Sequence, residues 1–182
     1  MGLKKLIIFT FTAAAITLFG GCSKNSDGKG ETGTVMLNTI DGKKLEVVYS
    51  EGQIKKFKDL NISGYDNKIV FLDFFSTSCG PCRDEIPHLV NLQEKYKDDF
   101  AVIGILVENK TLEEIKDFAQ LFQINYQVTD AGKDYVMTDL VGGVRGIPAM
   151  FMFDKSGKYF THYIGAVPQA MIENDIKKIL AK

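Results

Sequence analysis

Two short apolar runs, 69–75 and 101–107, lie on either side of a stretch with helical periodicity, 80–97. Each run is rich in β-branched and aromatic residues, as expected for a central strand that is covered on both faces. The apolar side of the helical stretch consists of Ile86, Leu89, Val90 and Tyr96. A strand–helix–strand unit of this kind pairs its two strands in parallel, so the chain is predicted to have an α/β fold.

The segments before this unit are shorter and more polar. Runs 35–40 and 45–49 flank Asp41-Gly42, which predicts an N-terminal β-hairpin. We interpret segment 56–67 as a connection with one helical turn.

The segments after the unit predict two more helices and a hairpin. Thr111-Leu112-Glu113-Glu114 is a capping-box pattern, and the apolar positions of the helix that follows are Leu112, Ile115, Phe118 and Phe122. Runs 149–153 and 159–164 surround a turn and form an antiparallel hairpin. Pro168 opens the last helix, whose apolar stripe is Ile172, Ile176, Ile179 and Leu180. With no internal repeat, we expect one domain over 34–182.

The first residues carry an export signal. Lys4 and Lys5 precede the uncharged run 6–19, which is too short for a bilayer span of roughly 20 residues and suits the core of a signal peptide. Gly20-Gly21-Cys22 then resembles the bacterial lipobox, although Phe19 stands where an aliphatic residue is usual. The resemblance implies cleavage after residue 21 and lipidation of Cys22. The alternatives are an ordinary signal peptide cut nearby or a retained anchor helix.

The residues that follow Cys22 form a polar segment. Residues 22–33 are rich in Ser, Gly, Lys and Asn, and we expect them to form a flexible tether. Removal of 1–21 takes away two lysines and no acid, so the formal charge becomes −3. This balance argues against a nucleic-acid binder, which needs a large basic patch.

If Cys22 is acylated, only Cys79 and Cys82 remain of the three cysteines. They lie in Cys79-Gly80-Pro81-Cys82, between the end of a strand and the start of a helix. Unpaired N–H groups and the helix dipole stabilise an anion there, so Cys79 is predicted to be the reactive thiolate. Cys82 lies one turn inside the helix and is predicted to be the shielded, resolving thiol. Pro81 is tolerated in the first turn, and Gly80 lets a partner chain approach.

These residues carry a family resemblance. Cys79-Gly80-Pro81-Cys82 matches the thioredoxin motif, and residues 82–87, Cys-Arg-Asp-Glu-Ile-Pro, resemble the TlpA/ResA branch of that superfamily. Gly146-Ile147-Pro148 matches its cis-proline loop. The resemblance covers about 34–182 and implies a thioredoxin-like fold, a central mixed sheet flanked by helices, with an added N-terminal β-hairpin. It also implies that Ile147 and Pro148 face the dithiol and contact the substrate backbone.

Two acids are candidate helpers of the dithiol. Asp73 interrupts an apolar strand six residues before Cys79, the position of the buried acid of thioredoxins. Burial would raise its pKa and let it take the proton of Cys82. Glu85 lies on the helix face of Cys82 and matches the active-site glutamate of ResA-like proteins; otherwise it is a solvated first-turn acid. His88 and His162 are isolated, and we interpret them as surface or packing residues.

The function predicted from these features is that of a periplasm-facing thiol–disulfide oxidoreductase, anchored in the inner or outer membrane through its lipid. The absence of His between the cysteines favours a reductase, whereas Ser78 replaces the usual tryptophan of thioredoxins. By resemblance, its partners are apocytochrome c or other exported proteins and a membrane electron donor of the DsbD/CcdA type. We expect a monomer without cofactor or metal. The alternatives are a Cu(I)-binding or delivery module and a disulfide oxidase or isomerase.

Overall fold

The two apolar runs of the sequence form the centre of the main sheet. They are β4 (Ile69–Phe75) and β5 (Phe100–Leu106), in which every residue is buried. The computed structural model, which describes residues 31–130 and 134–182, pairs them in parallel. Helix α1 (Gly80–Lys95) makes the crossover between them, so the predicted strand–helix–strand unit is confirmed.

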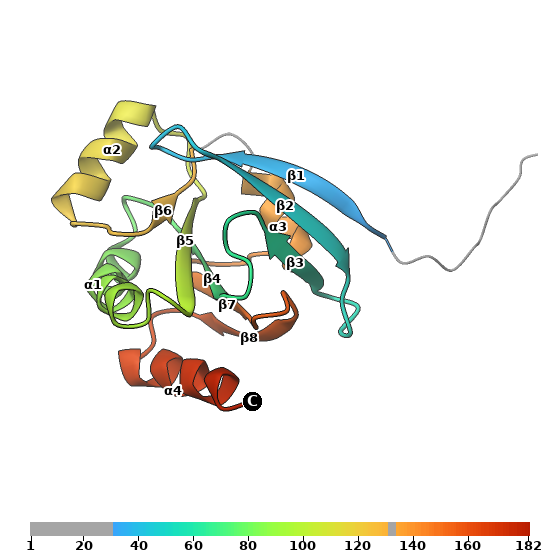
Figure 1. Cartoon of the computed structure of the whole chain (residues 1–182). Helices are drawn as coiled ribbons and strands as arrows, with labels where there is room; N and C mark the ends of the chain where they lie inside the picture. Colours follow the sequence, from blue (N-terminus) through green and yellow to red (C-terminus); the bar gives the residue numbers. More distant parts are fainter. Residues whose placement is uncertain (1–30, 131–133) are drawn as a thin grey trace, which may run out of the picture.

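Three further strands complete this sheet in the order β6-β5-β4-β7-β8 (Figure 1). Strand β6 (Gln127–Val128) runs parallel to β5. Strands β7 (Ala149–Phe153) and β8 (Tyr159–Ile164) form the predicted antiparallel hairpin, and β7 pairs with β4. The result is the central mixed sheet of a thioredoxin-like fold.

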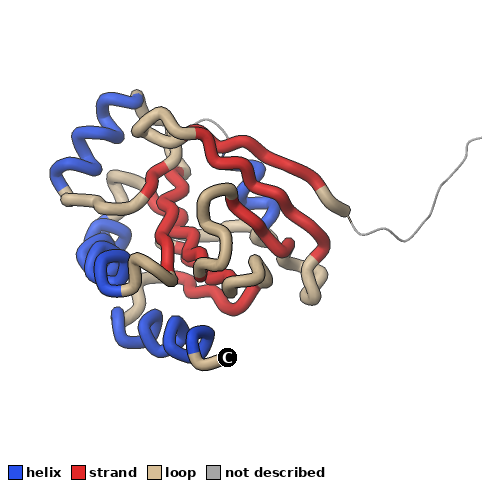
Figure 2. Tube along the Cα trace, in the orientation of Figure 1, coloured by secondary structure: helices blue, strands red, loops and turns tan. Residues whose placement is uncertain are grey.

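Helices cover both faces of the sheet (Figure 2). Helices α1 and α4 (Gln169–Leu180) pack on one face, where they bury Phe71, Leu89, Leu92, Phe100, Met150, Ile172 and Ile176. Helix α3 (Asp134–Leu140), which the sequence patterns did not predict, packs on the other face together with the N-terminal strands. Helix α2 (Leu112–Leu121) starts with the expected capping box at Thr111 and packs where β4 and β5 end.

The N-terminal strands form a sheet of three strands. Strands β1 (Gly33–Asn38) and β2 (Lys44–Glu51) make the predicted hairpin. The segment predicted as a connection instead contains β3 (Lys58–Ile62), which pairs antiparallel with β2. That prediction was wrong because β3 is short and half polar, and only its alternate residues Leu60 and Ile62 face the core.

The predicted apolar sides of the helices are correct for most of their central residues and less so toward their ends. Leu112 is 47% exposed and Leu180 is also exposed, since each is a terminal residue of its helix and extends past the core. In α1, Leu92 is buried, whereas Val90 and the C-cap residue Tyr96 are only partly buried.

Candidate active site

The dithiol lies at the N-terminal end of α1, directly after β4. Cys79 is the N-cap residue, and its Sγ accepts a hydrogen bond from the backbone N–H of Cys82 at 3.2 Å. Pro81 occupies the first turn, which contains no acidic residue. An anion on Cys79 Sγ would therefore face the positive end of the helix dipole and a backbone donor.

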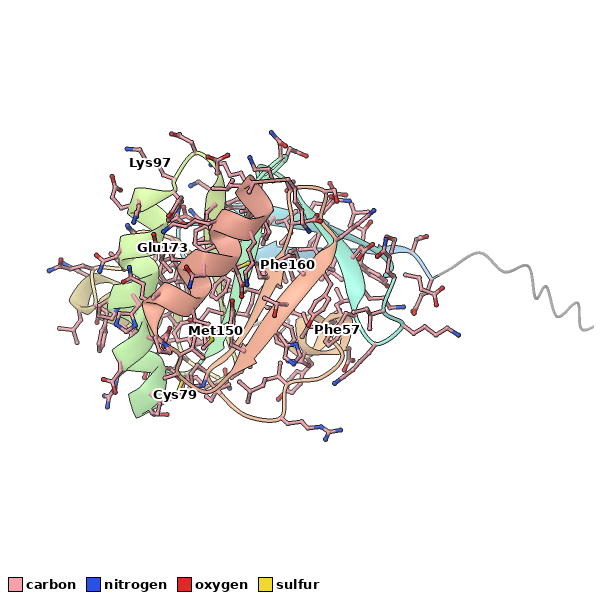
Figure 3. The ribbon with its side chains drawn as sticks, turned by 90° about the horizontal axis from the view of Figure 1, so that it is seen from below. Phe57, Cys79, Lys97, Met150, Phe160 and Glu173 are labelled. Carbon is pink, nitrogen blue, oxygen red and sulfur yellow. A yellow bond between two sulfur atoms is a disulfide. The ribbon has the colours of Figure 1, made fainter. Side chains whose placement is uncertain are left out.

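The structure is the oxidised form. Cys79 and Cys82 are joined by a disulfide with an S–S distance of 2.09 Å. Cys82 is only 1% exposed, whereas Cys79 is partly exposed, and Figure 3 shows Cys79 at the end of α1. A Cβ atom placed on Gly80 would meet only open space. An incoming polypeptide can therefore approach the pair on the Cys79 side.

The predicted cis-proline loop lies against this pair. The Ile147–Pro148 peptide bond is cis, and the Pro148 carbonyl accepts a hydrogen bond from Gly165 N–H at 2.8 Å. Ile147 packs on the apolar cluster that contains Cys82, and Cys79 packs on the same cluster. The fold thus brings together two segments that are far apart in the sequence.

A pocket of about 310 Å³ adjoins the same loop. Its wall is cationic and aromatic, and it is lined by Lys56, Phe57, Gly143, Arg145, Gly146, Phe151, His162 and Ile164. His162 is exposed, stacks on Phe151 and makes a hydrogen bond with Tyr159, which agrees with its interpretation as a surface or packing residue.

Asp73 is buried behind the dithiol. It lies on the face of β4 that carries Phe71 and Phe75, under α1, and is 1% exposed. Among the described residues nothing makes a hydrogen bond to its Oδ1. Burial, reinforced by the nearby charge of Glu85, raises the pKa of Asp73 to about 8. This carboxyl group can therefore bind and release a proton near neutral pH.

Glu85 is buried as well, so the interpretation as a solvated acid is wrong. It is 1% exposed, because α1 turns this position toward the segment that precedes α4. Its Oε2 accepts a hydrogen bond from Val167 N–H at 3.3 Å. Burial raises the pKa of Glu85, and the Val167 N–H and the charge of His88 partly offset this effect.

Tyr126 is a member of the site that the sequence patterns missed. Its ring fills the space beside Gly104, whose Cβ would lie 3.5 Å from Tyr126 Cε2. Gly104 is the register partner of Asp73 in β5. Burial raises the pKa of Tyr126, and the charges of Asp73 and Glu85 raise it further. A glycine inside a buried strand was the available signal, because it often marks a close approach.

Glu108 was missed too. Its Oε1 accepts a hydrogen bond from the backbone N–H of Thr77 at 2.5 Å, and thereby holds the loop that carries Cys79. The position of Glu108 just after β5 was the available signal, because parallel neighbouring strands end at the same edge.

Two of the sequence-based predictions concern other parts of the chain. The predicted signal peptide and the lipidated Cys22 lie outside the described residues. Within 31–130 and 134–182, no helix has the length and apolar character needed to cross a bilayer. Over the same ranges, no three His, Cys, Asp or Glu side chains gather as a metal site would require.

Comparison with known proteins agrees with this geometry. The AhpC/TSA family matches residues 29–159. Thiol-disulfide oxidoreductases ResA from Bacillus thuringiensis and Bacillus anthracis are each 30% identical over 184 residues, covering 97% of this chain and 95% of the relative. A solved thiol:disulfide interchange protein of the thioredoxin family from Chlorobium tepidum is 27% identical, with a TM-score of 0.64 over 85% of this chain and 99% of that chain. The chain therefore belongs to the AhpC/TSA family, and it is a thiol–disulfide oxidoreductase of the ResA type.

Proposed function

We propose that this oxidoreductase reduces disulfides of exported proteins, with apocytochrome c as one substrate class. The observation that carries the proposal is the contrast between the two sulfurs, a partly exposed Cys79 and a buried Cys82 at the start of α1. One sulfur can meet a large substrate, while the other can react only with its neighbour.

The reaction begins with the reduced protein. The Cys79 thiolate attacks one sulfur of the substrate disulfide, the substrate S–S bond breaks, and the other substrate sulfur leaves as a thiolate. Cys82 then gives its proton to the buried carboxyl pair and attacks Cys79 Sγ. The second substrate sulfur leaves, and the product is the Cys79–Cys82 disulfide, the state of this structure.

Each remaining site residue has a place in this scheme. Asp73 and Glu85 accept the proton of Cys82: Asp73 is buried under α1, Glu85 is buried on α1 itself, and a raised pKa makes each carboxylate a stronger base. Ile147 and Pro148 contact the substrate backbone. Gly80 and Pro81 form the surface over which the substrate approaches, and the open space beside Gly80 supports this role.

The proposed location is the outer side of a bacterial membrane. In this proposal residues 1–21 are removed, Cys22 carries the lipid, and 22–33 tether a monomeric domain to the inner or outer membrane. A membrane donor of the DsbD/CcdA type would then restore the dithiol. The proposed direction, reduction of the substrate, is inferred from the residues between the cysteines, because Gly80 and Pro81 are found there and no His.

Replacement of the resolving thiol tests the proposal. In cells that express Cys82→Ala, we expect exported proteins to accumulate on Cys79 as mixed disulfides that a reductant releases. The matched control is Cys79→Ala, which should trap nothing. Cytochrome c precursors among the trapped proteins would support the finer assignment. If no mixed disulfide forms, the mechanism is wrong; if the trapped proteins are cytoplasmic, the location is wrong.

A further inference from the structure

The buried polar atoms without partners gather in one place. Over the described residues, three buried side-chain atoms have no hydrogen-bond partner: Asp73 Oδ1, Glu85 Oε1 and His88 Nδ1. Buried polar groups are almost always paired, so each exception needs a physical explanation. All three belong to the region of β4 and α1 behind Cys82, which indicates a shared role there.

His88 connects this region with solvent. It lies one turn after Glu85 on α1, and its Nδ1 is 3.9 Å from Glu85 Oε1. This separation is about 1 Å longer than a hydrogen bond, so a small rotation of either side chain closes it. The Glu85 side chain is 2% exposed, whereas the His88 side chain is 43% exposed. The imidazole therefore has one nitrogen beside a buried carboxylate while much of its ring meets water.

The buried carboxyl pair has no exposed surface of its own. Asp73 and Glu85 are each 1% exposed, and the groups around Glu85 are Asp73 from β4, Tyr126 from the segment before β6, and the Val167 N–H before α4. The raised pKa of Tyr126 makes it a poor proton donor or acceptor at neutral pH. A proton taken from Cys82 therefore needs another way out.

We propose that His88 carries this proton between Glu85 and solvent, so that it acts in disulfide exchange through Glu85 without touching the substrate. This inference rests on the proposed role of Cys82 and the two acids. It adds a role to a residue that the sequence suggested was a surface or packing residue, and whose side chain is 43% exposed.

The proton balance is simple. Cys82 loses its proton to the carboxyl pair, and its thiolate displaces the substrate sulfur from Cys79. The leaving thiolate takes a proton from water. As the pair takes this proton, Glu85 passes one to His88 Nδ1 and the other ring nitrogen releases one to water, since an imidazole can accept and donate at opposite sides of its ring. The relay therefore operates during resolution by Cys82, and the proton count of the acids is unchanged when the step ends.

Stopped-flow kinetics with a coloured aromatic disulfide tests the inference. The reduced protein should release one coloured thiolate when Cys79 attacks and a second when Cys82 resolves the mixed disulfide. For His88→Ala we expect the second phase to be about tenfold slower near pH 7, with the first phase unchanged within a factor of two. The difference should shrink toward pH 9, where hydroxide can replace the relay.

Two further variants separate proton transfer from a structural contact. His88→Gln keeps a hydrogen-bond donor beside Glu85 but cannot relay a proton, so it should be as slow as His88→Ala. Added imidazole should restore the second phase of His88→Ala, where the ring has left space, and not that of His88→Gln. Asn91→Ala, an exposed change on the same helix, should behave as the wild type.

The outcomes that overturn the inference are distinct. An unchanged second phase in His88→Ala, a wild-type rate in His88→Gln, or equal slowing of both phases would each show that His88 does not carry the proton. If the wild-type protein itself releases only one equivalent, the proposed resolution by Cys82 fails instead.

Discussion

Buried or partly buried carboxylates lie beside or on α1 in two places, and their surroundings are opposite. Near the dithiol, Asp73 and Glu85 have no lysine or arginine among their partners. Farther along, Glu173 of α4, which is labelled in Figure 3, makes hydrogen bonds with Lys95 at the end of α1 and with its C-cap residue Tyr96, and an ion pair with Lys177. The same kind of side chain is therefore placed once without cations and once among them.

The difference shows what each place does. Hydrogen bonds from Lys177, Lys95 and Tyr96 lower the pKa of Glu173 to about 2, so this carboxylate stays charged and joins the two helices. Burial without a cation raises the pKa of Asp73 to about 8, so this group exchanges protons near neutral pH. A carboxyl group that must bind and release protons needs buried surroundings without a cation, and a carboxylate that joins two helices needs cations beside it.

The largest expected effect is on the rate of resolution by Cys82, which should depend on Asp73 and not on Glu173. Asp73→Asn cannot accept a proton, so resolution by Cys82 should be about 100-fold slower at pH 7. The second phase of coloured-thiolate release measures this, while the first phase should change little. Glu173→Gln is the matched control and should leave both phases unchanged. If both substitutions slowed the second phase equally, Asp73 could not be distinguished from Glu173 as the group that accepts the proton.

The next largest effect is on the free energy of unfolding, and the direction of its change with pH follows from the pKa of Asp73. The pKa of Asp73 is about 8 in the folded protein, against 3.8 as the ordinary value. Between these values the unfolded chain loses this proton and the folded protein keeps it, so the free energy of unfolding falls as pH rises from about 4 to about 8. By pH 7 this loss amounts to about 4 kcal/mol.

Asp73→Asn removes this penalty but buries an amide, which costs about 1–3 kcal/mol. The oxidised variant should therefore be more stable than the wild type by about 2 kcal/mol at pH 7, and the advantage should disappear at about pH 5 and reverse toward pH 4. Denaturant titrations of the oxidised proteins at several pH values measure it. A constant difference across this range would mean that Asp73 does not titrate as described.

The smallest effect concerns Glu173, whose contribution to stability changes with pH in the opposite direction to that of Asp73. The pKa of Glu173 is lowered from 4.5 to about 2, so its contribution to stability is present above pH 4.5 and is lost as pH falls through about 2. Glu173→Gln should lower the thermal midpoint slightly at pH 7, and less in high salt, because Lys95 and Lys177 are exposed. A variant that is more stable at pH 7 would contradict this assignment.

Local patterns predicted most of the elements. The runs that became β4 and β5 are apolar throughout, and the dithiol marks the junction between strand and helix, so local information was sufficient there. It was insufficient for β3, which is held by pairing with β2 and by two core residues. Helix α3 is seven residues long and was missed for the same reason, since such a short helix depends on packing.

The candidate site also contains residues that local patterns predicted and residues that they did not. Cys79, Cys82 and the cis-proline loop could be predicted because short sequence motifs identify them. Tyr126, Glu108 and the role of His88 could not, since they depend on contacts between residues far apart in the chain or on which face of α1 is covered.

By itself the sequence determined the strand–helix junction and the reactive pair, because the end of an apolar strand, a first-turn proline and the spacing of two cysteines are local properties. Only the tertiary structure decided how the acids behave. The pKa of a carboxyl group depends on water and on neighbouring charges, and those were set when β4, α1 and the segment before α4 packed around Asp73 and Glu85 without a lysine or arginine.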